Sequence, residues 1–148
     1  MAKRQEPIRK SVKEILEDLL AGHREAAFNG PESALKYLRR TFEGQASLPN
    51  AVKAVAYDLQ AEAQAQLGQW EGCIASVDRV LALLPDLEAA FPHEYRRMLA
   101  GMTCFERGIQ AHSELGDFHA ALELCEKALA LDLGAHYAAK RDSLDWAR

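Results

Sequence analysis

The sequence predicts an all-α fold built from repeated helix–turn–helix units. Alanine and leucine dominate the 148 residues and β-branched residues are sparse, a composition that favours helices over strands. Apolar residues recur at spacings of three and four, which places them on one face of a helix. Glycines interrupt these segments, and the pattern around Gly68 returns around Gly116. No segment alternates strictly between apolar and polar residues, so we expect no sheet.

Two helices are predicted before the first long loop. The first spans Ile8–Phe28, and the segment Asn29-Gly30-Pro31 ends it. Glycine permits unusual backbone angles there, and proline suits the first turn of a new helix. The second helix is expected over Pro31–Phe42, followed by a loop from Gly44 to Asn50.

Five more helices are predicted after that loop. Asn50 is a candidate N-cap for the third helix, and Pro85 is expected to end the fourth. Residues 86–90 can form one isolated helical turn. The helices are expected over Asn50–Leu67, Trp70–Leu84, His93–Leu115, Phe118–Leu131 and Ala135–Trp146, with turns at Gly68-Gln69 and Gly116-Asp117.

An internal repeat appears when Gly68 is aligned with Gly116, an offset of 116 − 68 = 48 residues. Glycine permits the chain reversal in each turn. The aromatic that follows it, Trp70 or Phe118, fills the wedge between two antiparallel helices. Because such a unit cannot bury its apolar face alone, it has to stack on neighbouring units.

The stretch from Gly116 to Asp132 (GDFHAALELCEKALALD) resembles the second half of a tetratricopeptide repeat (TPR), and Gly68 to Pro85 (GQWEGCIASVDRVLALLP) is similar. A degenerate third copy surrounds Asn29-Gly30-Pro31. The resemblance implies antiparallel helix–turn–helix repeats stacked as a short right-handed TPR-like superhelix, closed by a C-terminal capping helix.

The chain departs from the family in its spacing. The family repeats about every 34 residues. An offset of 48 therefore implies an insertion of about 48 − 34 = 14 residues. We place it between Pro85 and Met102. Gln64 and His112 replace the large aromatic that the family carries late in its first helix, and Leu133 replaces its closing proline. A single helical bundle with local TPR character is the alternative fold.

We therefore expect one TPR-like helical domain over residues 8–148, preceded by a disordered basic N-terminus over residues 1–7. Its expected parts are a degenerate repeat (8–44), a repeat (50–85), an insertion or helix extension (86–101), a second clear repeat (102–133) and a capping helix (135–147).

The charge balance and the cysteines limit the function further. A net charge of −4 gives no general attraction to nucleic acid or anionic lipid. No apolar run reaches the roughly 20 residues of a membrane span, so we expect no membrane partner and a cytoplasmic location. Three cysteines do not describe a disulfide framework. We expect Cys73 and Cys125 in the core and Cys104 to be partly exposed.

No catalytic, metal or cofactor site is predicted. The five histidines lack the spacing of a metalloprotease helix. The nine glycines are scattered over turns and do not form a phosphate-binding loop. No histidine has a defined relation to Cys104, as a thiol nucleophile requires. We therefore do not expect an enzyme.

The TPR resemblance implies that the first helix of each unit lines a concave, peptide-binding groove. Family members that bind acidic chaperone tails carry Lys and Asn there, whereas this chain carries acids and amides. The predicted function is a protein–protein interaction module, an adaptor or small chaperone-like protein, for a basic or neutral peptide or helix rather than an acidic C-terminal tail. The implied groove residues are Asp58, Glu62, Gln66, Glu106, Arg107, Gln110 and Glu114.

Two alternatives remain from the sequence. The repeat ends or the inserted region can mediate a self-assembling homo-oligomer. A basic cluster near the N-terminus can instead serve an acidic partner or a nucleic-acid-linked regulator, although the acidic balance of the chain speaks against nucleic acid. The cluster consists of Lys3, Arg4, Arg9, Lys10 and Lys13, with Lys36, Arg39 and Arg40 beside it.

Overall fold

The computed structural model describes residues 10–44 and 48–147. The described residues form helices and their connections and contain no strand, so the all-α prediction is confirmed. The expected disordered segment 1–7, with Lys3, Arg4 and Arg9 of the basic cluster, lies outside the described residues. The helices are α1 (Val12–Phe28), α2 (Pro31–Gly44), α3 (Asn50–Gln66), α4 (Trp70–Ala90), α5 (Tyr95–Gly101), α6 (Cys104–Glu114), α7 (Phe118–Ala130) and α8 (His136–Ala147).

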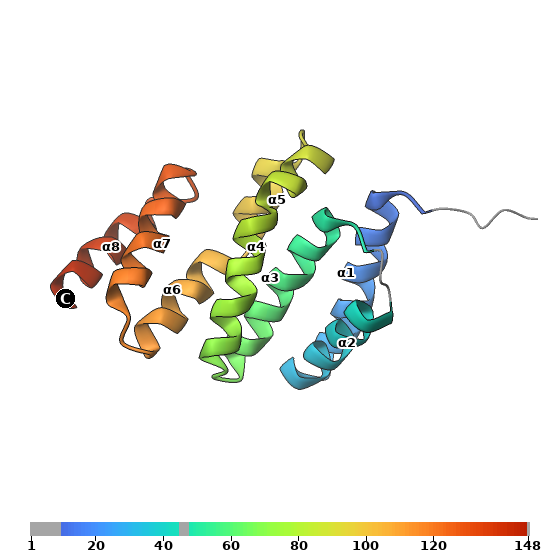
Figure 1. Cartoon of the computed structure of the whole chain (residues 1–148), viewed down its shortest axis with the longest axis horizontal. Coiled ribbons are helices and arrows are strands. Elements are labelled where there is room, and N and C mark those ends of the chain that lie inside the picture. Colours follow the sequence, from blue (N-terminus) through green and yellow to red (C-terminus); the bar gives the residue numbers. More distant parts are fainter. Residues whose placement is uncertain (1–9, 45–47, 148) are drawn as a thin grey trace, which may run out of the picture.

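The helices lie in a row along the long axis of the molecule, with α1 and α2 at one end and α7 and α8 at the other (Figure 1). The most extensive packing joins α3 to α4, and α6, α7 and α8 pack in succession beyond them. Helices of the two ends make no extensive contact with each other. The core therefore runs lengthwise through the row.

Helix α3 occupies the centre of this row. It packs against α1, α2, α4 and α6, so side chains on almost every side of it are buried. Alanine fills most of these positions, because small side chains let four neighbours approach one helix closely. The buried alanines of α3 are Ala51, Ala54, Ala56, Ala61, Ala63 and Ala65.

Helix α1 begins later than predicted. Ser11 is its N-cap: the Ser11 hydroxyl accepts from the Glu14 amide at 3.2 Å, and the Glu14 carboxylate accepts from the Ser11 amide at 3.4 Å. This reciprocal arrangement is a capping box. Lys10 and Ser11 are not helical, so the expected start at Ile8 is wrong.

Three helices end in the same turn. After α3, α6 and α7 the backbone takes a positive φ, +71° at Gly68, +78° at Gly116 and +57° at Asp132. The amide of the following residue then bonds back to the carbonyl five residues earlier, as Asp117 does to His112 at 2.8 Å. This is the Schellman motif. It confirms the turns predicted at Gly68 and Gly116 and adds one at Asp132.

Helix α4 was predicted to end before Pro85. In the structure it continues to Ala90. A proline inside a helix removes one hydrogen bond and costs about 3 kcal/mol. Leu84 and Leu87 on either side of it are buried, Leu87 completely. Burying a leucine contributes about 2 kcal/mol, so packing of the extended helix offsets most of the cost.

Two other predicted boundaries also differ. The single helix expected over His93–Leu115 is divided into α5 and α6, because Met102 between them is extended (φ −79°, ψ 150°). Asn50 is not an N-cap; it is the first residue of α3, and Pro49 precedes it without a side-chain cap. The predicted insertion, residues 86–101, therefore consists of the end of α4 and the whole of α5.

The matching turns at Gly116 and Asp132 predict opposite effects of substitution. Gly116→Ala places a Cβ in the left-handed region and should lower the free energy of unfolding by about 1 kcal/mol. Asp132→Gly relieves the same strain and should raise it by up to about 1 kcal/mol. Urea unfolding measures both. Gly101→Ala, in open space without a positive φ, is the control, and equal losses in all three variants would contradict the assignment.

Candidate functional site

Four of the predicted groove residues form one hydrogen-bonded network between α3 and α6. Arg107 Nε donates to Glu62 Oε2 at 2.7 Å, and Arg107 Nη2 donates to Glu62 Oε1 at 2.8 Å. Gln66 donates to Glu62 at 3.1 Å, and Arg107 donates to Gln110 at 2.8 Å. The hydrogen bonds from Arg107 lower the pKa of Glu62. We call these four residues the polar network.

The network restrains its own side chains. Glu62 and Arg107 are each 28% exposed, and their bidentate geometry fixes both groups more firmly than a single contact would. A ligand that needed either charge would first have to break this pair. Glu62 and Arg107 therefore serve mainly to connect α3 to α6, and Gln66 and Gln110 lie on either side of this ion pair.

Asp58 has a different environment from its predicted neighbours. Only 6% of the residue is exposed, and its carboxylate accepts from the backbone amides of Cys104 at 2.8 Å and Thr103 at 3.1 Å. Burial raises the pKa of Asp58 to about 7, against the two backbone hydrogen bonds that lower it. Asp58 thus caps α6 from inside the protein and is not available at a surface groove, contrary to its predicted place.

Glu106 and Glu114 are exposed along α6. Glu106 Oε1 lies 3.2 Å from His136 Nε2, which connects α6 to α8. Glu114 makes no hydrogen bond or ion pair with any described residue. The predicted stripe thus extends beyond α3 and α6 to α8. His136 was not predicted at this site, because a single histidine 30 residues away carries no periodic signal.

All three cysteines are buried and free. Cys73 and Cys125 lie in the core as predicted, but Cys104 is buried as well, because its position at the start of α6 faces α3 rather than solvent. Burial raises the pKa of the Cys73 thiol to about 11. A thiol with so high a pKa stays protonated at neutral pH and is a poor nucleophile.

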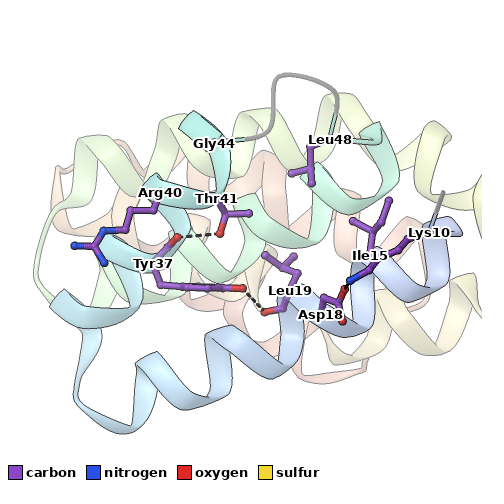
Figure 2. Close-up of a pocket in the computed structure, with 9 residues that line it drawn as sticks. All are labelled: Lys10, Ile15, Asp18, Leu19, Tyr37, Arg40, Thr41, Gly44 and Leu48. Atoms are coloured by element: carbon purple, nitrogen blue, oxygen red, sulfur yellow. Dashed lines mark hydrogen bonds and ion pairs between the residues drawn. The ribbon is translucent and has the colours of Figure 1, made fainter. Parts of the chain in front are cut away.

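A cleft with a volume of about 610 Å³ lies at the α1–α2 end (Figure 2). Its polar groups bond to one another: Lys10 pairs with Asp18, and the Tyr37 hydroxyl donates to the Leu19 carbonyl at 3.4 Å. The Arg40 side chain points away from the others (Figure 2). The cleft therefore offers no convergent set of free polar groups to a substrate.

Neither a metal cluster among the described residues nor a match to a known protein points to a function. Within residues 10–44 and 48–147, no three His, Cys, Asp or Glu side chains are grouped as a metal ion requires. No described helix combines the length and the apolar character needed to cross a bilayer. No protein-family model, curated protein or solved structure matches the chain.

The raised pKa of Asp58 predicts an unusual pH dependence. In the folded state Asp58 keeps its proton up to about pH 7, whereas the unfolded chain releases it near pH 3.8. Between these values the unfolded state binds fewer protons, so the free energy of unfolding falls as the pH rises. Over this window the loss amounts to at most about 4 kcal/mol.

The matched variant is Asp58→Asn, which keeps the shape and an acceptor oxygen but cannot ionise. Urea unfolding measures both proteins at a series of pH values. From pH 4 to about 7, the free energy of unfolding of the wild type should fall relative to that of the variant. All other carboxyl groups titrate in both proteins and cancel. A difference that stays constant with pH would rule out this role for Asp58.

Proposed function

We propose that this chain is a TPR-like interaction module that binds a basic or neutral polypeptide along the polar face of α3, α6 and α8. The observation that carries the proposal is the continuity of this face. The polar network joins α3 to α6, and Glu106 with His136 joins α6 to α8, so one surface crosses three helices.

Repetition of the helical units supports the TPR-like part of the proposal. The pairs α3–α4 and α6–α7 both turn at a glycine with positive φ, and each turn is followed directly by an aromatic that opens the next helix. In such a stack α3 and α6 are the first helices of their units, which line the concave side in that family.

The charges of this face indicate its partner. Glu62 is neutralised by Arg107, and Asp58 is buried, so neither contributes a free charge to the surface. Glu106 and Glu114 keep exposed carboxylates, and Gln66 and Gln110 offer amide donors and acceptors. Such a surface attracts cationic side chains and can pair with a peptide backbone. An acidic segment would be repelled.

The test compares three short labelled peptides in which lysine, glutamine or glutamate alternates with alanine. Fluorescence anisotropy at low salt should rank the lysine peptide above the glutamine peptide, and the carboxylates of this face should contribute nothing to binding of the glutamate peptide. The double variant Glu106→Lys, Glu114→Lys should weaken binding of the lysine peptide about tenfold. This corresponds to a loss of about 1.4 kcal/mol of binding free energy. Both positions are exposed, so the fold should survive.

The control is Asp78→Lys, Glu126→Lys, which makes the same charge change at exposed positions of α4 and α7. It should leave the affinity for the lysine peptide within about twofold of the wild type. Equal weakening in both double variants would show a general charge effect and would refute a binding face on α3, α6 and α8.

A second candidate function is self-assembly, and two side chains favour it. Phe28 is 92% exposed at the end of α1, and Trp146 is 91% exposed near the end of α8. These helices lie at opposite ends of the row (Figure 1). Contact between two different end surfaces joins molecules head to tail, and such contacts produce open chains when they do not close into a ring.

Light scattering over a range of concentrations tests this second function. The wild type should grow in mean size with concentration, and Phe28→Ser and Trp146→Ser should each prevent the growth, because each removes one half of the contact. Leu115→Ser, which changes a half-exposed leucine at the α6–α7 turn, is the control and should leave the growth unchanged. A wild-type monomer at every concentration would exclude self-assembly.

A further inference from the structure

A second groove lies on the opposite side of α3 from the polar network. Helices α2 and α4 both pack on α3 but make at most marginal contact with each other. The trough between them has a volume of about 390 Å³, with α3 as its floor. Tyr57, Gln60 and Gln64 form that floor. At helical spacing they point about half a turn away from Glu62 and Gln66.

Small residues on α4 keep the trough open. Gly72, Ala75 and Ser76 lie at spacings of three and four and form one stripe along its wall. The Gln64 side chain packs directly on Gly72, where an added Cβ would lie 2.7 Å from its terminal amide. The same amide lies 2.6 Å from the Ser76 hydroxyl. The floor is therefore held in place by contacts between α3 and α4.

Arg79, one turn beyond that stripe, is held over the floor. Its guanidinium carbon lies 5.3 Å from the centre of the Tyr57 ring, and Nη1 donates to the Tyr57 hydroxyl at 3.2 Å. Tyr57 in turn stacks on Phe42 of α2, with ring centres 4.7 Å apart. The cation is thus oriented by an aromatic pair, while its other N–H groups remain without an acceptor among the described residues.

Arg39 lines the trough from the opposite wall, on α2. Neither Arg39 nor Arg79 forms an ion pair with a described residue, whereas Arg107 and Arg141 each do. The one acidic residue of the lining is Glu43. Two exposed guanidinium groups therefore face one trough, and the charges of the lining leave an excess of one positive charge.

We call this groove between α2 and α4 the arginine trough. We propose that it binds an acidic polypeptide segment whose carboxylates pair with Arg39 and Arg79. Guanidinium groups match carboxylates in geometry and charge. The Gln60 amide can donate to and accept from a peptide backbone, and the Tyr57–Phe42 pair provides an apolar surface for the segment. The trough is open along its length, which suits an extended chain better than an enclosed small molecule.

This site is independent of the proposed function. It uses other side chains, the opposite side of α3 and a ligand of the opposite charge. The double variant Glu106→Lys, Glu114→Lys should therefore leave binding at the arginine trough unchanged. If either binding surface fails its own test, the conclusion about the other is unaffected.

The test measures fluorescence anisotropy of a labelled glutamate–alanine peptide, with the matching glutamine–alanine peptide as the uncharged probe. The wild type should bind the glutamate peptide, and Arg39→Gln, Arg79→Gln should weaken that binding at least about tenfold. Arg96→Gln, Arg97→Gln removes two exposed arginines of α5 and should change the affinity less than about twofold. Thermal melts confirm that each variant is folded.

Glu43→Gln should increase the affinity for the glutamate peptide, an effect that partial unfolding of the variant cannot produce. The substitution removes the one carboxylate of the trough. The proposal is overturned if the two peptides bind equally, if Arg96→Gln, Arg97→Gln weakens binding as much, or if Glu43→Gln has no effect. Complete displacement of the peptide by equimolar inorganic phosphate would instead identify a site for a free anion and would overturn the polypeptide ligand.

Discussion

The amide groups at the start of α6 lie in the interior, and Asp58 of α3 accepts their hydrogen bonds. The first amides of a helix have no partner within the helix, and leaving them buried without an acceptor is costly. Thr103 stands at the N-cap position but provides no side-chain cap. The position of α6 on α3 therefore depends on one carboxyl group that comes from 45 residues earlier.

This junction joins two helices that no short chain segment connects. Between α4 and α6 the chain makes an extended helix and then α5, and α6 begins after the extended residue Met102. The Asp58 cap holds the first turn of α6 against α3, and the Glu62–Arg107 pair holds the next turn. Two polar contacts thus hold α6 against α3, although α4 and α5 separate these two helices along the chain.

Features set by neighbouring residues were predictable from the sequence. The turns at Gly68 and Gly116 follow from the need for a positive φ, which glycine meets without strain. The break after Leu131 was predicted as well, but not the positive φ of Asp132, because aspartate adopts this conformation less often than glycine and marks it weakly. Pro85 gave the wrong helix end, because the burial of Leu87 that offsets its cost depends on tertiary packing.

Contacts between distant residues could not be predicted in the same way. The periodicity of α3 placed Asp58, Glu62 and Gln66 on one stripe, but it could not show that Asp58 meets the start of α6 while Glu62 meets Arg107. Those partners are 46 and 45 residues further along the chain, respectively. The arginine trough was equally hidden, since Arg39, Tyr57 and Arg79 come from three helices and share no spacing.

The central position of α3 explains why so much of the chemistry gathers around it. Its alanines allow neighbours to pack on almost every side, and only narrow strips of its surface remain between them. One strip carries acids and amides that brace α6, and the other carries Tyr57 and two amides beneath a pair of arginines. Because the strips lie on opposite sides of one helix, the two proposed partners of opposite charge would not compete for the same surface.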